Sequence, residues 1–336
     1  MDIINCSNNL QCTEQIRKHL SLDILSLITS SSINEKTEII DVKDSTGRLD
    51  FFIDHLKMHF PNCNFTNFKN NLSNLKIVVG KKMTLMDRYY LWKNYASGMC
   101  FDNKNKILVK NEELLEKGVL VHELLHLASK KHFKTGSYSY AGLQQSIRDK
   151  KIVTGNSINE GCTEYFSFLI TGECNAYFNE VKIARLIELV VGQRKLSEAY
   201  FNADLKSLVD ELIKYSDYET VNAFINYCDT IRICAGEYIN KIEIDNHTGD
   251  DVTDYDYAKN VYHEITRILF EMLKNKLSMV EVSNDEKMVL YNYFINICDT
   301  KKDFGNNNML ECFEFLSVGL RNNIENEINS LKGFTR

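Results

Sequence analysis

Hydrophobic and polar positions along the chain predict strands and helices before residue 111 and almost only helices after it. Strand-like apolar segments lie at residues 37–42 and 75–80, and residues 99–111 suit two short strands around an Asp-Asn-Lys-Asn turn. Helical spacing covers residues 13–29 and 47–60, and Pro61 ends the second of these helices. We therefore expect a small mixed sheet in the N-terminal part of the chain.

From Asn111 onward the spacing of apolar residues turns helical, and Asn111 itself is a suitable N-cap. In the C-terminal half, helices are predicted at residues 178–191, 197–215, 219–241, 254–279, 284–299 and 309–331. The predicted fold class is therefore α+β, predominantly α, with an all-α C-terminal half. We expect three segments: residues 1–110 with the sheet, residues 111–180, and a helical domain at residues 181–336.

Composition narrows the classes of protein to consider. The chain has 336 residues, a net charge of −6 and ten cysteines, and 44% of its residues are hydrophobic. It has no basic excess for binding phosphates, so we expect no nucleic-acid and no membrane partner. The N-terminus lacks the apolar run of a signal peptide, and no segment is apolar enough to span a bilayer, which predicts a cytoplasmic protein. The cysteines form no CxxC pair, so we expect reduced thiols. The oligomeric state stays open.

One motif carries chemistry: residues 119–132 read VLVHELLHLASKKH and contain an HExxH sequence. On a helix, His122 and His126 lie on the same face one turn apart, so both imidazoles can bind one ion. Glu123 is one position further round, where its carboxylate can reach a water on that ion. This arrangement is typical of zinc hydrolases. The flanking residues are apolar nearly all round the helix, so we expect it to be buried.

A catalytic zinc site normally has a third protein ligand, and the sequence offers two candidates. His132 has the spacing of the metzincin pattern HExxHxxGxxH, but Ser129 replaces its glycine, and no methionine follows before Met272. We expect His132 to be a cation at the helix end and keep it as an alternative ligand. The other candidate is Glu160.

Glu160 lies in SINEGCTEYFSFL, residues 157–169, where Asn156 or Ser157 can cap a helix. Glu164 follows four residues later on the same face. If this face packs against the HExxH helix, it brings one carboxylate to the ion and the other to the ligands around the ion. A solvated acidic helix edge is the alternative interpretation.

HELLH followed by NEGCTEY resembles the gluzincin pattern of thermolysin-like proteases and of the aminopeptidase family that includes leukotriene A4 hydrolase. It also looks like zincin-like proteins of low-GC Gram-positive bacteria. The resemblance covers about residues 99–180 and implies a zincin-like metallopeptidase core with one Zn²⁺ per chain. It also implies that Glu160 is the third ligand and that Glu164 holds a zinc histidine by its other nitrogen. We expect Asn159 to support the ligands as well.

The implied reaction is hydrolysis of peptide bonds in a peptide or protein substrate. Glu123 would take a proton from a zinc-bound water and deliver it to the leaving nitrogen. An oxyanion donor is also required, and among many tyrosines and histidines we select Tyr140. The strand at residues 106–110, or its neighbour, could bind an extended substrate. Two alternatives remain: a non-catalytic binding or regulatory protein on a zincin scaffold, and a metzincin-like protease that uses His132.

Overall fold

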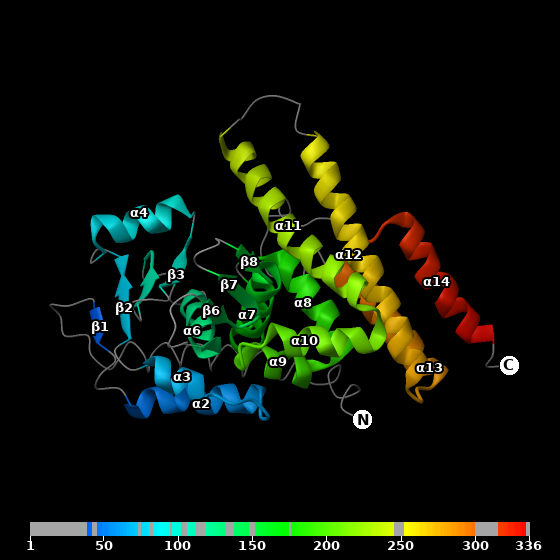
Figure 1. Cartoon of the computed structure of the whole chain (residues 1–336), viewed down its shortest axis with the longest axis horizontal. Coiled ribbons are helices and arrows are strands. Elements are labelled where there is room, and N and C mark those ends of the chain that lie inside the picture. Colours follow the sequence, from blue (N-terminus) through cyan, green and yellow to red (C-terminus); the bar gives the residue numbers. More distant parts are fainter. Residues whose placement is uncertain are drawn as a thin grey trace. The chain divides into compact units, whose positions relative to one another are not determined.

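The computed structural model shows a predominantly helical α+β protein with small sheets, which confirms the predicted class (Figure 1). It describes residues 39–41, 46–72, 75–80, 83–94, 96–101, 106–111, 114, 118–131, 138–147, 152–174, 176–244, 252–299 and 315–333. The helix predicted at residues 13–29 lies outside this part of the chain.

The chain forms two compact units, and each is assembled from several stretches of sequence. The first unit contains residues 1–132, 163–176 and 201–203. The second contains residues 133–162, 177–200 and 204–336. The three consecutive segments expected from the sequence stay a prediction.

The first unit contains a four-stranded mixed sheet in the order β1-β2-β4-β3. Its strands are β1 (Ile39–Asp41), β2 (Lys76–Val79), β3 (Gly98–Phe101) and β4 (Lys106–Val109). Strands β2 and β4 are parallel, whereas β1 and β3 run antiparallel to their neighbours. Strands β1, β2 and β4 fall within the segments that the sequence predicts to be strands, and β3 begins one residue before its predicted segment. Strand β3 lies at an edge of this sheet.

Helices cover both faces of the sheet. Among the described residues before 132, this unit has the helices α2 (Thr46–His59), α3 (Thr66–Leu72), α4 (Leu85–Lys93) and α6 (Val119–Ser129), followed by the two-residue strand β5 (Lys130–Lys131). Helix α4 packs Leu91 against Val78 and Leu108. Because side chains alternate along a strand, Gly98 of β3 faces the other side, where α6 packs. The sequence analysis predicted α2 but missed α3 and α4.

In the second unit, β6 (Tyr138–Ala141), β7 (Gln144–Ile147) and β8 (Ile152–Thr154) form an antiparallel meander. Helix α7 (Asn156–Thr171) follows; its first seven residues belong to the second unit and the rest to the first. The sequence analysis expected mostly helix after Asn111 and missed this meander. Its strands are short and partly polar, so their alternation is weak.

Most of the helices after α7 agree closely with the predicted ones. Helices α8 (Phe178–Val191) and α13 (Asn284–Asp299) have the predicted bounds. The long helices α11 (Tyr218–Ile244) and α12 (Val252–Met279) pack side by side (Figure 1). Helix α14 is Val318–Gly333, and part of its predicted range lies outside the described residues.

The prediction of one continuous helix at residues 197–215 is wrong, because the structure divides this segment. The segment instead contains α9 (Gln193–Phe201), α10 (Leu205–Leu212) and the 3₁₀ helix η5 (Ile213–Tyr215). The helical conformation is interrupted at Ala203, whose φ is 52°. Asp204 then caps α10 by accepting a hydrogen bond from the backbone N–H of Ser207.

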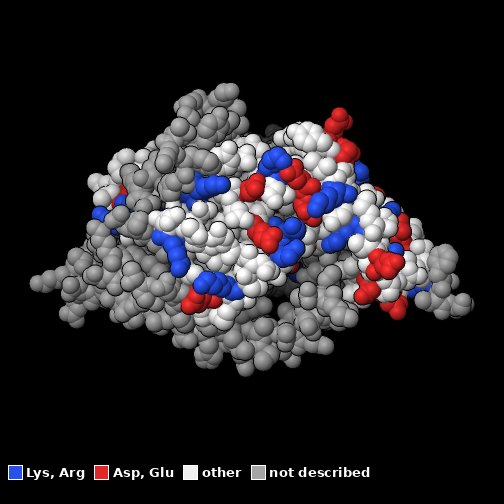
Figure 2. All heavy atoms as spheres, turned by 60° about the horizontal axis from the view of Figure 1, so that its bottom comes forward, with Lys and Arg blue, Asp and Glu red and all other residues white. Residues whose placement is uncertain are grey.

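In the part of the chain that the structure describes, no helix is both long and apolar enough to cross a membrane. On the face drawn in Figure 2, lysine and arginine side chains lie among aspartates and glutamates. The described part of that face therefore carries both signs of charge close together.

Candidate metal centre

Helix α6 carries the HExxH motif and is buried on most of its surface, as the sequence predicts. Leu120, Leu124 and Leu127 are at most 1% exposed. The carboxyl end of the helix is fixed by Asn71 of α3, whose buried amide nitrogen donates to the backbone oxygens of Leu127 and Lys130, both at 2.8 Å. Asn71 thus adds a side-chain donor at this end of the helix, where the backbone N–H of Lys130 also bonds to the carbonyl oxygen of Leu127.

The two histidines of α6 turn their Nε2 atoms toward each other, 3.1 Å apart. Their Nδ1 atoms face α7: Nδ1 of His122 lies 2.7 Å from Oε2 of Glu164, and Nδ1 of His126 lies 3.5 Å from Oγ1 of Thr163. A carboxylate only accepts hydrogen bonds, so it favours the tautomer of His122 with its proton on Nδ1. Nε2 of His122 then offers a lone pair, and the same tautomer of His126 would direct a second lone pair at the same point.

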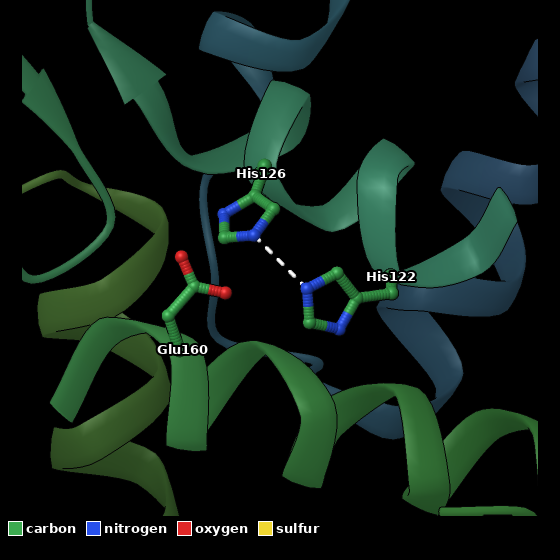
Figure 3. A group of neighbouring side chains, drawn as sticks. All are labelled: His122, His126 and Glu160. Atoms are coloured by element: carbon green, nitrogen blue, oxygen red, sulfur yellow. Dashed lines mark hydrogen bonds between the residues drawn. The ribbon is translucent and has the colours of Figure 1, made fainter. Parts of the chain in front are cut away.

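The carboxylate of Glu160 approaches this point from the first half of α7 (Figure 3). One ligand atom from each of His122, His126 and Glu160 lies within 4.8 Å of the others. Two nitrogens bound to one tetrahedral zinc would be about 3.3 Å apart, close to the observed separation of the Nε2 atoms. The donor set therefore fits a metal ion: two imidazole lone pairs that face each other and one carboxylate.

Glu164 and Asn159 lie on the same helix and have different contacts. Besides His122, the carboxylate of Glu164 accepts a hydrogen bond from the backbone N–H of Ala176 at 3.2 Å, and Glu164 is 4% exposed. The side-chain oxygen of Asn159 accepts one from the backbone N–H of Leu143 at 3.1 Å. Asn159 thus ties α7 to the turn between β6 and β7, and its expected role beside the ligands stays a prediction.

Glu123 is buried against the edge strand β3. Its Oε1 lies 2.9 Å from the position that a Cβ atom on Gly98 would occupy, and Cγ1 of Val119 lies 2.6 Å from it. Real Cβ atoms do not approach other atoms so closely, so glycine at position 98 leaves room for the glutamate. The carboxylate predicted to be the base therefore lies between α6 and the backbone of β3.

The remaining residues to consider are Tyr140, His132 and Cys162. Tyr140 lies in β6 opposite Gln145 and is half-buried. His132 lies outside the described residues, so the structure does not test it as a ligand. Cys162 is fully buried on α7, and burial raises the pKa of its thiol far above the usual range, with a smaller contribution from Glu188. Among the described residues, the group of side chains that could hold a metal ion contains His122, His126 and Glu160 and does not include Cys162.

Sequence reasoning missed Asn71, Gly98 and Thr163. Thr163 lies three residues after Glu160, so helical periodicity could have placed it near the histidines. Asn71 and Gly98 come from α3 and β3, and their spacing from the motif gives no signal.

Comparisons with protein-family models, with curated proteins and with solved structures found no match for this chain.

Proposed function

We propose that this chain is a zinc-dependent peptidase of gluzincin type with one Zn²⁺ held by His122, His126 and Glu160. The observation that carries the proposal is the convergence of two Nε2 atoms and a carboxylate. Two histidines and a glutamate are the ligand set of one class of catalytic zinc site, which leaves a coordination position open for water. When bound, zinc supplies Lewis-acid polarisation of the scissile carbonyl and a water of lowered pKa.

The chain's own residues supply the remaining chemistry. Glu164 holds the Nδ1 proton of His122, which orients the imidazole and makes Nε2 a stronger ligand. Glu123 is adjacent to His122 on α6 and is only 6% exposed. In this buried position its carboxylate accepts a proton from the attacking water and then passes it to the leaving nitrogen. Tyr140 remains our proposed donor to the oxyanion.

An extended peptide would bind along β3. The sequence analysis named the strand at residues 106–110 or its neighbour, and β4 is internal, because it pairs with both β2 and β3. Strand β3 lies at the sheet edge, where backbone groups can pair with a substrate. Glu123, the base that we propose, lies close to Gly98 in this strand, which supports binding of the substrate there.

Helix α4 suggests a preference among peptides. Its side chains Leu85, Met86 and Trp92 are 86%, 58% and 70% exposed, and the ring of Tyr90 contacts that of Phe101 in β3, with 5.5 Å between centroids. A peptide paired with β3 directs every second side chain toward the face that α4 covers. We therefore expect cleavage of peptides with large apolar residues at these positions, and Tyr90→Ala should weaken that preference in library profiling.

Metal analysis tests the ligand set. We expect about one zinc per chain in the wild type and in His132→Ala, and loss of zinc in His126→Ala and Glu160→Ala. His132→Ala is the matched control, because it removes a histidine with a competing claim to the site. Zinc retained in Glu160→Ala and lost in His132→Ala would favour the metzincin-like alternative.

Peptide cleavage tests the reaction. We would incubate the zinc-loaded protein with a library of ten-residue peptides, once with blocked and once with free termini, and identify products by mass spectrometry. Glu123→Gln should retain zinc and lose cleavage, because the amide cannot accept the proton. Stoichiometric zinc without cleavage of either library by the wild type would support a non-catalytic binding protein instead.

A further inference from the structure

Helix α7, which carries Glu160, begins at Asn156, so the expectation that Asn156 or Ser157 is the residue that caps it is wrong. Gly155 precedes the first helical residue, and its carbonyl accepts the first intrahelical hydrogen bond, from the N–H of Asn159 at 2.9 Å. A glycine has no side chain to cap the helix, and the first turn contains no acidic residue. No other residue fits here: φ is +76°, and a Cβ would lie 2.3 Å from the carbonyl oxygen of Leu143.

Asp229 of α11 supplies the missing acceptor from a distant part of the sequence. Its Oδ2 accepts a hydrogen bond from the backbone N–H of Gly155 at 2.7 Å, and its Oδ1 accepts one from the N–H of Ser157 at 3.3 Å. A carboxylate at this end also interacts favourably with the helix dipole. Gly155, Ser157 and Asp229 all belong to the second unit.

The capped turn leads directly to the metal ligand. Glu160 is the fifth residue of α7, one turn beyond the N–H groups that Asp229 binds. Further along, Glu164 is held by His122, and Ser167 donates a hydrogen bond to the carbonyl oxygen of Gly118. The second half of the helix therefore has anchors of its own. The turn that leads to Glu160 is buried, and its hydrogen bonds to other elements include those with Asp229 and the contact of Asn159 with Leu143.

We propose that Asp229 is a positioning residue for the metal site: it fixes the first turn of α7 and so sets the approach of Glu160 to His122 and His126. This inference rests on the proposed metal site. Loss of the cap would let the first turn fray while Glu164 still holds His122. The ion would then lose its carboxylate ligand and keep its histidines.

The test measures Co²⁺ and Zn²⁺ affinity by chelator competition, and the visible spectrum of bound Co²⁺, in Asp229→Ala and Asp229→Asn. For Asp229→Ala we expect roughly 10-fold weaker binding and a Co²⁺ spectrum shifted toward that of Glu160→Gln. Asp229→Asn keeps a side-chain oxygen as acceptor and should recover part of the affinity. The matched control is Asp204→Ala, which removes a carboxylate cap from α10, 3.0 Å from the N–H of Ser207.

A double-mutant cycle separates positioning from general destabilisation. If Asp229 acts through Glu160, Asp229→Ala combined with Glu160→Gln binds metal no more weakly than Glu160→Gln alone. Additive losses, or a Co²⁺ spectrum like that of Asp204→Ala, overturn the proposal. If Asp229→Ala fails to fold, the same cycle with Asp229→Asn decides. Absence of metal binding in the wild type would instead refute the metal site itself.

Discussion

Gly98→Ala tests whether Glu123 is placed by the edge strand. The new methyl group would lie 2.6 Å from Cγ1 of Val119 and 2.9 Å from Oε1 of Glu123. Carbon atoms in contact prefer about 3.5–4.0 Å, so the neighbours must move by about 1 Å. The φ angle of Gly98 is not in the left-handed region, so alanine brings no backbone strain there, and the effect is one of overpacking.

Overpacking of this kind costs about 1–3 kcal/mol of stability. The consequence for activity is larger if Glu123 is the base, because a displacement of about 1 Å can lower kcat/KM by about 100-fold. His122 and His126 keep their contacts with α7, so the metal content should stay at the wild-type level.

Three measurements decide this prediction: kcat/KM on a peptide cleaved by the wild type, zinc content, and the midpoint of thermal unfolding. The matched control is Gly319→Ala in α14, where a Cβ would have open space and alanine should stabilise the helix by about 0.5–1 kcal/mol. Wild-type kcat/KM and stability in Gly98→Ala would refute the placement of Glu123 against β3. Loss of zinc would show that α6 moves as a whole.

Three further substitutions test separate contacts. Glu164→Ala should weaken zinc binding about 10–100-fold, because Nδ1 of His122 loses its acceptor; unchanged affinity in chelator competition would argue against this role. Asn71→Ala removes the amide donor that two buried carbonyl oxygens share and should cost about 1–3 kcal/mol in urea unfolding, whereas a neutral result would mean that α6 ends without help from this side chain. Burial raises the pKa of Asp87, but its hydrogen bonds, chiefly with Lys106, lower this pKa overall. The ionised carboxylate therefore stabilises the fold above the ordinary carboxyl pKa, and this stabilisation is lost as the pH falls through the lowered pKa. Asp87→Asn should therefore destabilise the protein at pH 7 and remove the part of the stability loss that the wild type shows below the ordinary carboxyl pKa; a profile parallel to that of the wild type would contradict the assignment.

The helical half of the fold could be predicted because its signals are local. The bounds of α8 and α13 follow from apolar spacing, with Gly192 directly after α8 and a local cap before α13, where the hydroxyl of Ser283 accepts from the backbone N–H of Glu286. The meander β6–β8 could not be predicted in the same way, because strands of three or four residues contain barely two periods. The break before α10 did carry a local signal, since Asp204 is a good N-cap, but apolar spacing continued across it.

The candidate site shows the same division between local and distant causes. Helix geometry alone brings His122 and His126 together, so the five residues of the HExxH motif were enough to predict the pair. Glu160 required the assumption that a second helix packs against the first, and Glu164 supports that packing through its contact with His122. Nothing in the motif predicts Asp229, because its contact with Gly155 spans 74 residues.

Residues such as Asp229 leave no signal in the motif for a physical reason, which concerns how metal ligands on helices are held in place. A metal ligand must be held within fractions of an ångström, and a helix fixes its own residues that well only where its ends are satisfied. Both helices of this site have an end completed by a side chain from elsewhere: Asn71 for the carboxyl end of α6 and Asp229 for the amino end of α7. Residues that only complete backbone hydrogen bonds need no particular spacing from the ligands. They can therefore hold the helices of the candidate site in place and yet leave no trace in the motif by which the site is predicted.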